Sequence, residues 1–358
     1  MTDREQEILE IVKTNPMITQ EALAQILGIQ RSSVAVHISN LIKKGKIKGK
    51  GYIVCEEAYV VVVGGCNMDI SGKPINKMIL HDSNIGQVQT STGGVGRNIA
   101  ENLSRLGISV KMISAVGNDE FGTMILSELN ALKVDTTGIM VHQSQPTSTY
   151  LAVSDETGDM HVAISQMNIV DEISVAYVNE FHHTIENAGC LVIDTNLKQE
   201  VLQYILNKYA HKKIFVDTVS TAKAIKVKGL LDKIYFLKPN LMEAELFSEY
   251  PLDPSNLVPF LKALPVKKVV ISLGGEGVIG RDEKEIVKIE SPRTEIVNTT
   301  GAGDAFMAGM IFSEIKQMPF HESIKFAASC ATHNIEQQET VSKALNESII
   351  NNLIKERM

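Results

Sequence analysis

Six short apolar runs recur after Tyr59, and amphipathic stretches of helical length lie between several of them. The runs are YVVVVGG, VKMISAV, CLVIDT, KIFVDT, KIYFLKP and KKVVISLGG, and the clearest amphipathic stretches are 98–106, 121–132 and 200–209. The runs are continuously apolar, as expected for strands that are buried on both faces. Their alternation with helices predicts a doubly wound α/β domain, with a mostly parallel sheet covered by helices on both sides.

Two regions of the same part of the chain follow another pattern. Residues 86–92, and residues 147–153 with 159–164, read as short strands in which polar and apolar residues alternate, the latter pair joined by DETGD. This pattern predicts a small antiparallel β-flap, or lid, at approximately 70–92 and 145–168. A flap at the carboxyl edge of a parallel sheet is placed to close over a ligand.

The first 57 residues predict a separate small domain. Apolar spacing favours a helix at 4–13, a second between Thr19 as N-cap and Gly28, and a third that ends at Gly45. The third helix is expected to bury Val34, Ile38, Leu41 and Ile42. With two short strands around Gly49 as a wing, this order predicts a winged helix-turn-helix domain at 1–57 in front of an α/β domain at 58–358.

Charge also separates the two parts. Residues 1–58 hold eight basic and seven acidic side chains, a net charge of +1, so the rest of a chain with net charge -7 carries -8. Candidate DNA contacts on the third helix are Arg31, Ser32, Ser33 and His37, and candidate phosphate contacts are Lys46, Lys48 and Lys50. The alternative is a docking or dimerisation domain whose lysines are simply solvated.

Composition excludes several classes of protein. A hydrophobic content of 44% with 22% charged residues is typical of a globular chain, and the longest apolar run is too short to span a bilayer. The N-terminus lacks the pattern of a signal peptide, and the four cysteines contain no CxxC, so we expect a cytoplasmic protein with reduced thiols. The sequence contains neither HExxH nor the P-loop pattern GxxxxGK[ST].

The stretch VNTTGAGDAF, at 297–306, carries the strongest chemical signal. Apolar residues after it predict a helix that begins near Gly301. Its free backbone N–H groups and positive dipole end would stabilise the developing charge of a phosphoryl group. Asp304, adjacent to this anion site, is placed to take a proton from an attacking hydroxyl. An Asp that only complements the helix dipole explains the carboxylate but not the Gly-Ala-Gly before it.

Three other glycine-rich or polar stretches are weaker signals. GGVGRN, at 93–98, suits the close approach of a polyhydroxyl ligand, although a tight turn is the alternative. In LKPNLMEAE, Asn240 and Glu243 lie three residues apart and could hold Mg²⁺ through water, with Lys238 adding positive charge. By itself this stretch is a capped helix, and ISLGGEGVIG is an ordinary hairpin.

Seven motifs in order give the larger domain a family resemblance. They are GGCNMD, GGVGRN, AVGNDEFG, FVDTVS, LKPNLMEAE, SLGGEGV and NTTGAGD. The chain from Tyr59 to the C-terminal region resembles the ribokinase-like, or PfkB, sugar and nucleoside kinases. Within that family, GGVGRNIAENL, STYLAVSDETGDM, AISQMNIVD and VNTTGAGDA are most similar to the branch that acts on pseudouridine.

The resemblance implies a role for each matching position. The sugar site would comprise Asn67, Asp69, Gly93, Gly94 and Asn98, and the base would be read by Thr149, Gln166 and Asn168. Asn240 and Glu243 would organise Mg²⁺, and the nucleotide would contact Lys238, Ser272, Gly274, Gly277 and Thr300. Gly301, Ala302 and Gly303 would form the anion hole, with Asp304 as the base.

One departure from the family concerns a monovalent cation. Many members have an acidic residue where this chain has Asn298, and that acid helps to hold an activating ion such as K⁺. Asn298 keeps an oxygen but loses the charge, so we expect weak or absent K⁺ activation.

The resemblance implies an ATP-dependent 5′-kinase of pseudouridine that uses Mg²⁺. The alternatives are another nucleoside or ribose kinase, and a transcription regulator that uses the kinase domain as a ligand sensor. A homodimer is expected, because winged helices and the family's flaps often pair.

Overall fold

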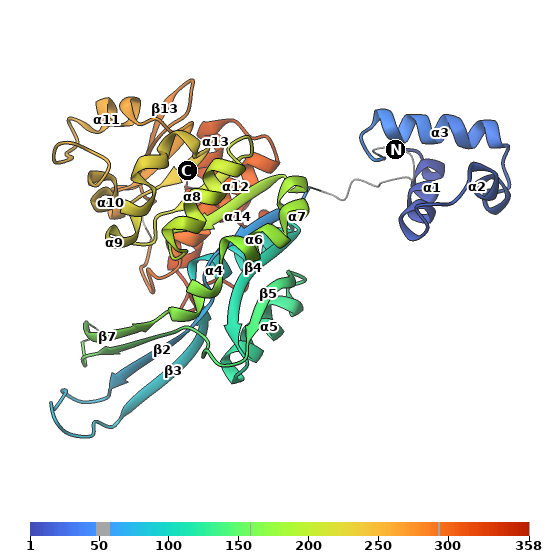
Figure 1. Cartoon of the computed structure of the whole chain (residues 1–358). Coiled ribbons are helices and arrows are strands. Elements are labelled where there is room, and N and C mark those ends of the chain that lie inside the picture. The colour runs from blue at the N-terminus through green and yellow to red at the C-terminus, as the bar shows by residue number, and fades with distance from the viewer. Residues whose placement is uncertain (48–57, 158, 293, 358) are drawn as a thin grey trace. The chain divides into compact units, whose positions relative to one another are not determined.

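The computed structural model describes residues 1–47, 58–157, 159–292 and 294–357. These fall into two compact units, Met1–Ala58 and Tyr59–Met358, each of which is described by itself (Figure 1). Among the described residues, no helix combines the length and apolarity needed to cross a membrane.

The N-terminal unit contains three helices with its own core. They are α1 (Asp3–Thr14), α2 (Gln20–Leu27) and α3 (Arg31–Lys43). Thr19 caps α2, and Gly28 ends it with φ +62°, as the sequence predicts. The prediction for Ile42 is wrong: this side chain is 47% exposed, because it follows the buried Leu41 and points to another side of the helix. The strands expected around Gly49 lie outside the described residues.

The larger unit is built on a nine-stranded sheet in the order β13-β12-β11-β10-β9-β8-β1-β4-β5. Its strands are β1 (Val60–Val63), β4 (Val110–Gly117), β5 (Asp135–His142), β8 (Cys190–Asp194), β9 (Ile214–Asp217), β10 (Phe236–Lys238), β11 (Lys268–Ser272), β12 (Val278–Arg281) and β13 (Ile286–Ile289). Neighbouring strands from β11 to β5 are parallel, and only β12 and β13 are antiparallel. All six apolar runs form strands of this sheet, which confirms the predicted fold class.

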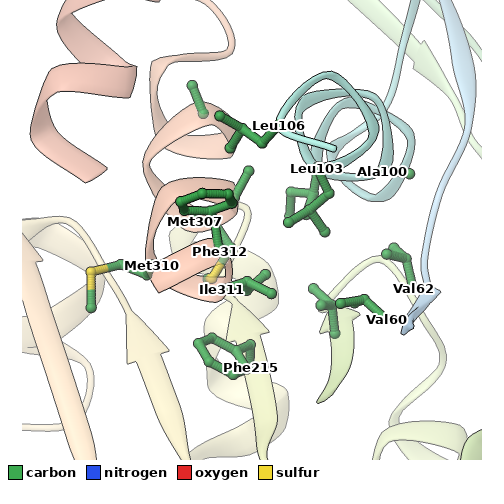
Figure 2. Packing of buried hydrophobic residues seen from close by; sticks show 14 of the residues in the cluster. Val60, Val62, Ala100, Leu103, Leu106, Phe215, Met307, Met310, Ile311 and Phe312 are labelled. Carbon is green, nitrogen blue, oxygen red and sulfur yellow. The ribbon is translucent and has the colours of Figure 1, made fainter. Parts of the chain in front are cut away.

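Helices cover both faces of the sheet. Val60 and Val62 of β1 belong to one core, which includes α4 (Val95–Arg105), α5 (Glu120–Ala131), α12 (Ala302–Ile315), α13 (Phe320–Ile335) and α14 (Glu347–Arg357). Figure 2 shows Leu103 of α4 and Ile311 of α12 in this core. Val61 and Val63 belong to the opposite core, which includes α6 (Val175–Glu180), α7 (His182–Asn187), α8 (Gln199–Lys208), α10 (Leu241–Glu245), α11 (Leu257–Ala263) and the 3-10 segments Asn168–Glu172 and Ile225–Lys233.

The lid is a second sheet, which extends away from the helices of this unit (Figure 1). Its strands, in the order β3-β2-β6-β7, are β2 (Asn67–Pro74), β3 (Gly86–Gly93), β6 (Thr149–Ser154) and β7 (Met160–Gln166). The prediction of an antiparallel flap is wrong in one respect, because β2 and β6 are parallel and the sheet is mixed. The reason is topological: β2 follows β1 and β6 follows β5, and both leave the same edge of the parallel sheet.

Candidate active site

Helix α12 begins at a position where only glycine fits. Gly301 has φ +80°, and a Cβ atom there would lie 2.1 Å from the carbonyl oxygen of Thr340. Ala302 and Gly303 are the first two residues of the helix, so their backbone stands at its positive end. The chain therefore forms the helix N-terminus that the sequence predicts, with a backbone suited to an anion.

The ammonium of Lys238, at the end of β10, lies beside this helix start. A Cβ atom on Gly303 would be only 3.1 Å from Nζ of Lys238, and Nζ is 3.3 Å from Oδ2 of Asp217. Burial lowers the pKa of Lys238, but the carboxylates of Asp217, Asp304 and Glu243 raise it by more, so the side chain stays charged. An ammonium beside a helix N-terminus is chemically suited to an anion of the phosphoryl type.

Asp304, in the first turn of α12, is buried next to this anion site. Its Oδ2 accepts a hydrogen bond of 2.8 Å from Nδ2 of Asn98. Burial and the carboxylate of Asp217 raise the pKa of Asp304 to about 8, against the lowering effects of Asn98 and Lys238. A carboxylate that titrates near neutral pH is suited to accept a proton from a hydroxyl.

Two further aspartates of the site were not singled out from the sequence. Asp194 and Asp217 are the last residues of β8 and β9, where the register pairs them directly. Oδ2 of Asp194 accepts hydrogen bonds from the backbone N–H groups of Gly65 at 2.8 Å and Gly96 at 3.0 Å, and so joins α4 to the end of β1. The signal was present, because each Asp ends an apolar run and adjacent parallel strands end at one edge.

The predicted sugar-site residues meet at the start of α4. Nδ2 of Asn67 donates to Oδ1 of Asp69 at 2.6 Å, and a Cβ atom on Gly93 would lie 2.1 Å from Oδ2 of Asp69. Gly94 has φ +100° and precedes α4, which carries Asn98 in its first turn. Polar groups suited to a sugar thus stand near Asn98, which contacts Asp304.

A cavity of about 580 Å³ adjoins the helix start and has the size of a small-molecule site. Its lining includes these predicted residues: Lys238, Asn240, Ser272, Gly274, Gly277, Ala302 and Gly303. Its apolar lining comprises Val278, Ile289, Phe306, Ala328, Ala331 and Ile335. Thr299 lines this cavity, whereas the predicted Thr300 is exposed and its carbonyl accepts a hydrogen bond from Asn334.

Asn240 and Glu243 bond to one another at the start of α10. Oδ1 of Asn240 accepts from the Glu243 N–H at 2.8 Å, and Oε2 of Glu243 accepts from the Asn240 N–H at 3.0 Å. Oε2 of the buried Glu243 also accepts from the hydroxyl of Thr218. Of the two residues, Asn240 is exposed and lines the cavity. Glu243 is buried and holds Asn240 in place through the two hydrogen bonds.

The three residues predicted to read the base lie at the lid. Thr149 pairs with Gln166 across β6 and β7, and the exposed Asn168 follows in the chain. Thr149 of β6 is paired with Met68 of β2, whereas the next residue, Tyr150, is paired with Asp69. Because paired residues share a face of a sheet, Thr149 and Gln166 lie on the face opposite to Asp69.

Asn298 bonds to the loop that follows α13. Its Nδ2 donates to the carbonyl oxygen of Gln338 at 2.9 Å, and its Oδ1 accepts from the Thr300 N–H at 2.9 Å. The amide thus joins two loops through its own hydrogen bonds.

In the N-terminal unit, the predicted DNA contacts lie in the first two turns of α3 and just beyond its end. Arg31 and Ser32 are exposed, while Ser33, His37 and Lys46 are partly exposed. Lys48 and Lys50 lie outside the described residues.

Comparison with known proteins places the chain in a family. The model of the pfkB family of carbohydrate kinases matches residues 57–347, and the chain belongs to this family of phosphotransferases that act on an alcohol group. A winged helix-turn-helix DNA-binding model matches residues 1–48, so a winged helix-turn-helix domain precedes the kinase domain.

Three relatives document the similarity. An uncharacterized sugar kinase, YeiI, of Escherichia coli is 37% identical, over 92% of this chain and 93% of its own. A pseudouridine kinase of the same organism is 36% identical, over 84% of this chain and 97% of its own. A structure from Clostridium perfringens, described as a sugar kinase, has a TM-score of 0.77 at 31% identity and covers 85% of this chain and 97% of its own.

Proposed function

We propose that this protein is an ATP-dependent kinase that transfers a phosphoryl group to the 5′-hydroxyl of pseudouridine. The proposal rests mainly on the surroundings of Asp304. Its carboxylate accepts a hydrogen bond from Asn98, and it lies in the first turn of α12, next to the ammonium of Lys238. A proton acceptor and an anion site side by side are what phosphoryl transfer to a hydroxyl requires.

In the proposed reaction, the oxygen of the 5′-hydroxyl attacks the γ-phosphorus of ATP while Asp304 takes the hydroxyl proton. The bond from that phosphorus to the β–γ bridging oxygen breaks, and ADP leaves. The backbone of Gly301, Ala302 and Gly303, with the ammonium of Lys238, stabilises the charge that develops on the phosphoryl oxygens. The cavity of about 580 Å³ would hold the nucleotide, with the adenine against its apolar wall. ATP is also the nucleotide in a ribokinase structure from Arabidopsis thaliana that shares this fold.

Bound Mg²⁺ would neutralise phosphate charge. Among the residues that the structure describes, no group of three or more His, Cys, Asp and Glu side chains could hold a metal ion. An ion held mainly by phosphate oxygens and water would suit this site, and Asn240, which lines the cavity and is bonded to Glu243, would orient the water around it.

Pseudouridine is favoured as the acceptor because the pseudouridine kinase of Escherichia coli matches this chain over 97% of its own length. Ribose and other nucleosides are the alternative acceptors, since more distant relatives are a guanosine-inosine kinase and ribokinases.

A panel of acceptors tests the substrate. ADP production by the full-length protein is expected to be at least tenfold faster, by kcat/KM, with pseudouridine than with uridine, inosine or ribose. The reason is that pseudouridine has an additional ring N–H, which an acceptor such as Asn168 would bind. If uridine were turned over equally well, the protein would not recognise the additional ring N–H. If ribose were preferred, the acceptor would not be a nucleoside.

Activity is expected to persist without potassium. The Nδ2 group of Asn298 already binds the Gln338 carbonyl, and the side chain brings no charge to attract an ion. Replacing K⁺ in the assay by tetramethylammonium should change kcat less than twofold. A collapse of the rate would contradict this prediction, and Asn298→Asp is the matched variant in which K⁺ activation is expected to appear.

A second function, sequence-specific DNA binding, is favoured by the winged helix-turn-helix match at residues 1–48 and by the exposed side of α3. In this proposal the kinase domain also senses the nucleoside. Binding to DNA upstream of its own gene is expected to weaken with salt and to disappear on deletion of residues 1–56. Arg31→Ala should weaken binding without changing kinase activity, and unchanged binding by the deleted chain would exclude the proposal.

We also propose a homodimer formed through the lid. Val88, Val162 and Ile164 are 73%, 49% and 62% exposed, and the strand register places all three on the face opposite to Asp69. An exposed apolar face of this kind is typical of an association surface. Sedimentation of the Ile164→Glu variant as a monomer, with the parent chain as a dimer, would support it.

A further inference from the structure

The guanidinium of Arg97 lies between the lid and the proposed catalytic base, and the reaction described above does not use it. Arg97 is 3% exposed and immediately precedes Asn98 in GGVGRN. Its Nη1 donates to Oδ1 of Asn98 at 3.2 Å and to the carbonyl oxygen of Thr92, in lid strand β3, at 3.3 Å. One nitrogen therefore contacts both the lid and the residue that holds Asp304.

The amide of Asn98 has two chemically opposite ends, and each has a partner that fits only that end. Nδ2 donates to Asp304, while Oδ1 accepts from Arg97. After a half-turn of the amide, an oxygen would face the carboxylate and an N–H₂ group would face the guanidinium, which can only donate. Arg97 therefore selects the orientation in which Asn98 donates to Asp304.

Arg97 is itself fixed from two helices. Its Nη2 lies 2.5 Å from Oε2 of Glu101 in α4 and 3.0 Å from Oε2 of Glu128 in α5. Oε1 of Glu101 is held by Arg105, and Glu128 accepts a hydrogen bond from the hydroxyl of Thr92. The guanidinium thus has a defined position relative to α4, α5 and β3.

We propose that Arg97 is a positioning residue for phosphoryl transfer, which orients the Asn98 amide toward Asp304 and links that amide to lid strand β3. The inference rests on the proposed function only in assigning Asp304 as the base.

Loss of this orientation has a consequence for the proton on Asp304. The charged groups that act on Asp304 are Asp194, Asp217 and Lys238, from the ends of β8, β9 and β10, and a change at Arg97 leaves all three in place. Without Arg97, Asn98 can turn its oxygen toward a protonated Asp304. The hydrogen bond that favours the carboxylate is then lost, and Asp304 holds its proton to higher pH.

The experiment is the pH dependence of kcat/KM for Arg97→Met, with Arg105→Met as the matched control. Both variants remove an arginine bound to Glu101, but Arg105 contacts neither Asn98 nor Thr92. The acidic limb of the Arg97→Met profile is expected to move up by about one pH unit, so activity falls about tenfold at pH 7 and recovers above pH 9. The control should keep the midpoint of the full-length parent chain.

Folding should survive because Glu101 keeps Arg105 and Glu128 is half exposed to water. If Arg97→Met is insoluble, Arg97→Lys replaces it, since lysine keeps a charge for Glu101 without the second nitrogen that donates to Asn98. An unmoved midpoint in the Arg97 variant, or an equal shift in Arg105→Met, would overturn the inference.

A second readout needs no substrate. Asp304 holds its proton more tightly in the folded chain than in the unfolded one, so its titration lowers Tm as pH rises, and this decline should end at higher pH in the Arg97 variant. If every acceptor fails in the kinase assay but this shift is found, the proposed function fails and the coupling of Arg97 to Asp304 stands. If the shift is missing while turnover is normal, only the inference about Arg97 fails.

Discussion

Asp304→Asn is expected to lower kcat by about 10³-fold, because asparagine cannot accept the proton of the attacking hydroxyl. KM for the nucleoside should change little, since the amide can still accept the hydrogen bond from Asn98. Steady-state kinetics with the accepted nucleoside measures both parameters. If the variant kept more than a tenth of the parent rate, Asp304 would not be the base.

The same variant is expected to be more stable than the parent chain. The pKa of Asp304 is raised above its unfolded value of 3.8, so ionisation of this group increasingly opposes folding as pH rises toward 8. Asparagine does not ionise, and we expect a gain of roughly 4 kcal/mol at pH 7, because pH 7 lies about three units above the unfolded pKa and each unit is worth about 1.4 kcal/mol. This gain corresponds to roughly 6 °C in Tm. Thermal unfolding between pH 4 and pH 8 should show the gain growing with pH.

Asp217→Asn is expected to shift the acidic limb of the rate profile in the direction opposite to that of Arg97→Met. The carboxylate of Asp217 raises the pKa of Asp304, so its removal should move the acidic limb of the rate profile to lower pH. A shift to higher pH would show that Asp217 acts mainly by holding Lys238 in place.

The fold could be predicted from local patterns where burial and secondary structure agree. The six apolar runs predict their strands because a parallel sheet buries them on both sides. The start of α12 is predicted because Gly301 needs a left-handed backbone before a helix. The parallel pairing of β2 with β6 could not be read from alternation, which is the same in parallel and antiparallel strands. It follows from the shared edge that both strands leave.

The site was predictable only in part, because several of its contacts join distant segments. The positions of Gly303 and Asp304 follow from one motif, but the contact of Asp304 with Asn98 spans more than 200 residues. Arg97 belongs to the motif GGVGRN, whose glycines alone suggested a function. Its role depends on Glu101 and Glu128, which lie in two different helices. For Glu243 the local pattern allowed two roles: the carboxylate that we predicted to organise Mg²⁺ also completes a capping box at the start of α10.

Lys238→Met is expected to reduce kcat/KM by about 10²- to 10³-fold, because the anion site at Gly303 loses its cation. The acidic limb should also move to higher pH, since Lys238 lowers the pKa of Asp304. Stability is expected to fall by roughly 3 kcal/mol, because Oδ2 of the buried Asp217 has Lys238 as its ion-pair partner.

The double variant Lys238→Met with Asp217→Asn separates these two effects. Removing both charges should restore much of the lost stability, because no uncompensated carboxylate remains at the end of β9. The rate should not recover, since neither replacement can stabilise the transferring phosphoryl group. Recovery of the rate in the double variant would mean that Lys238 serves only to neutralise Asp217. The anion site would then depend on the N-terminus of α12 alone.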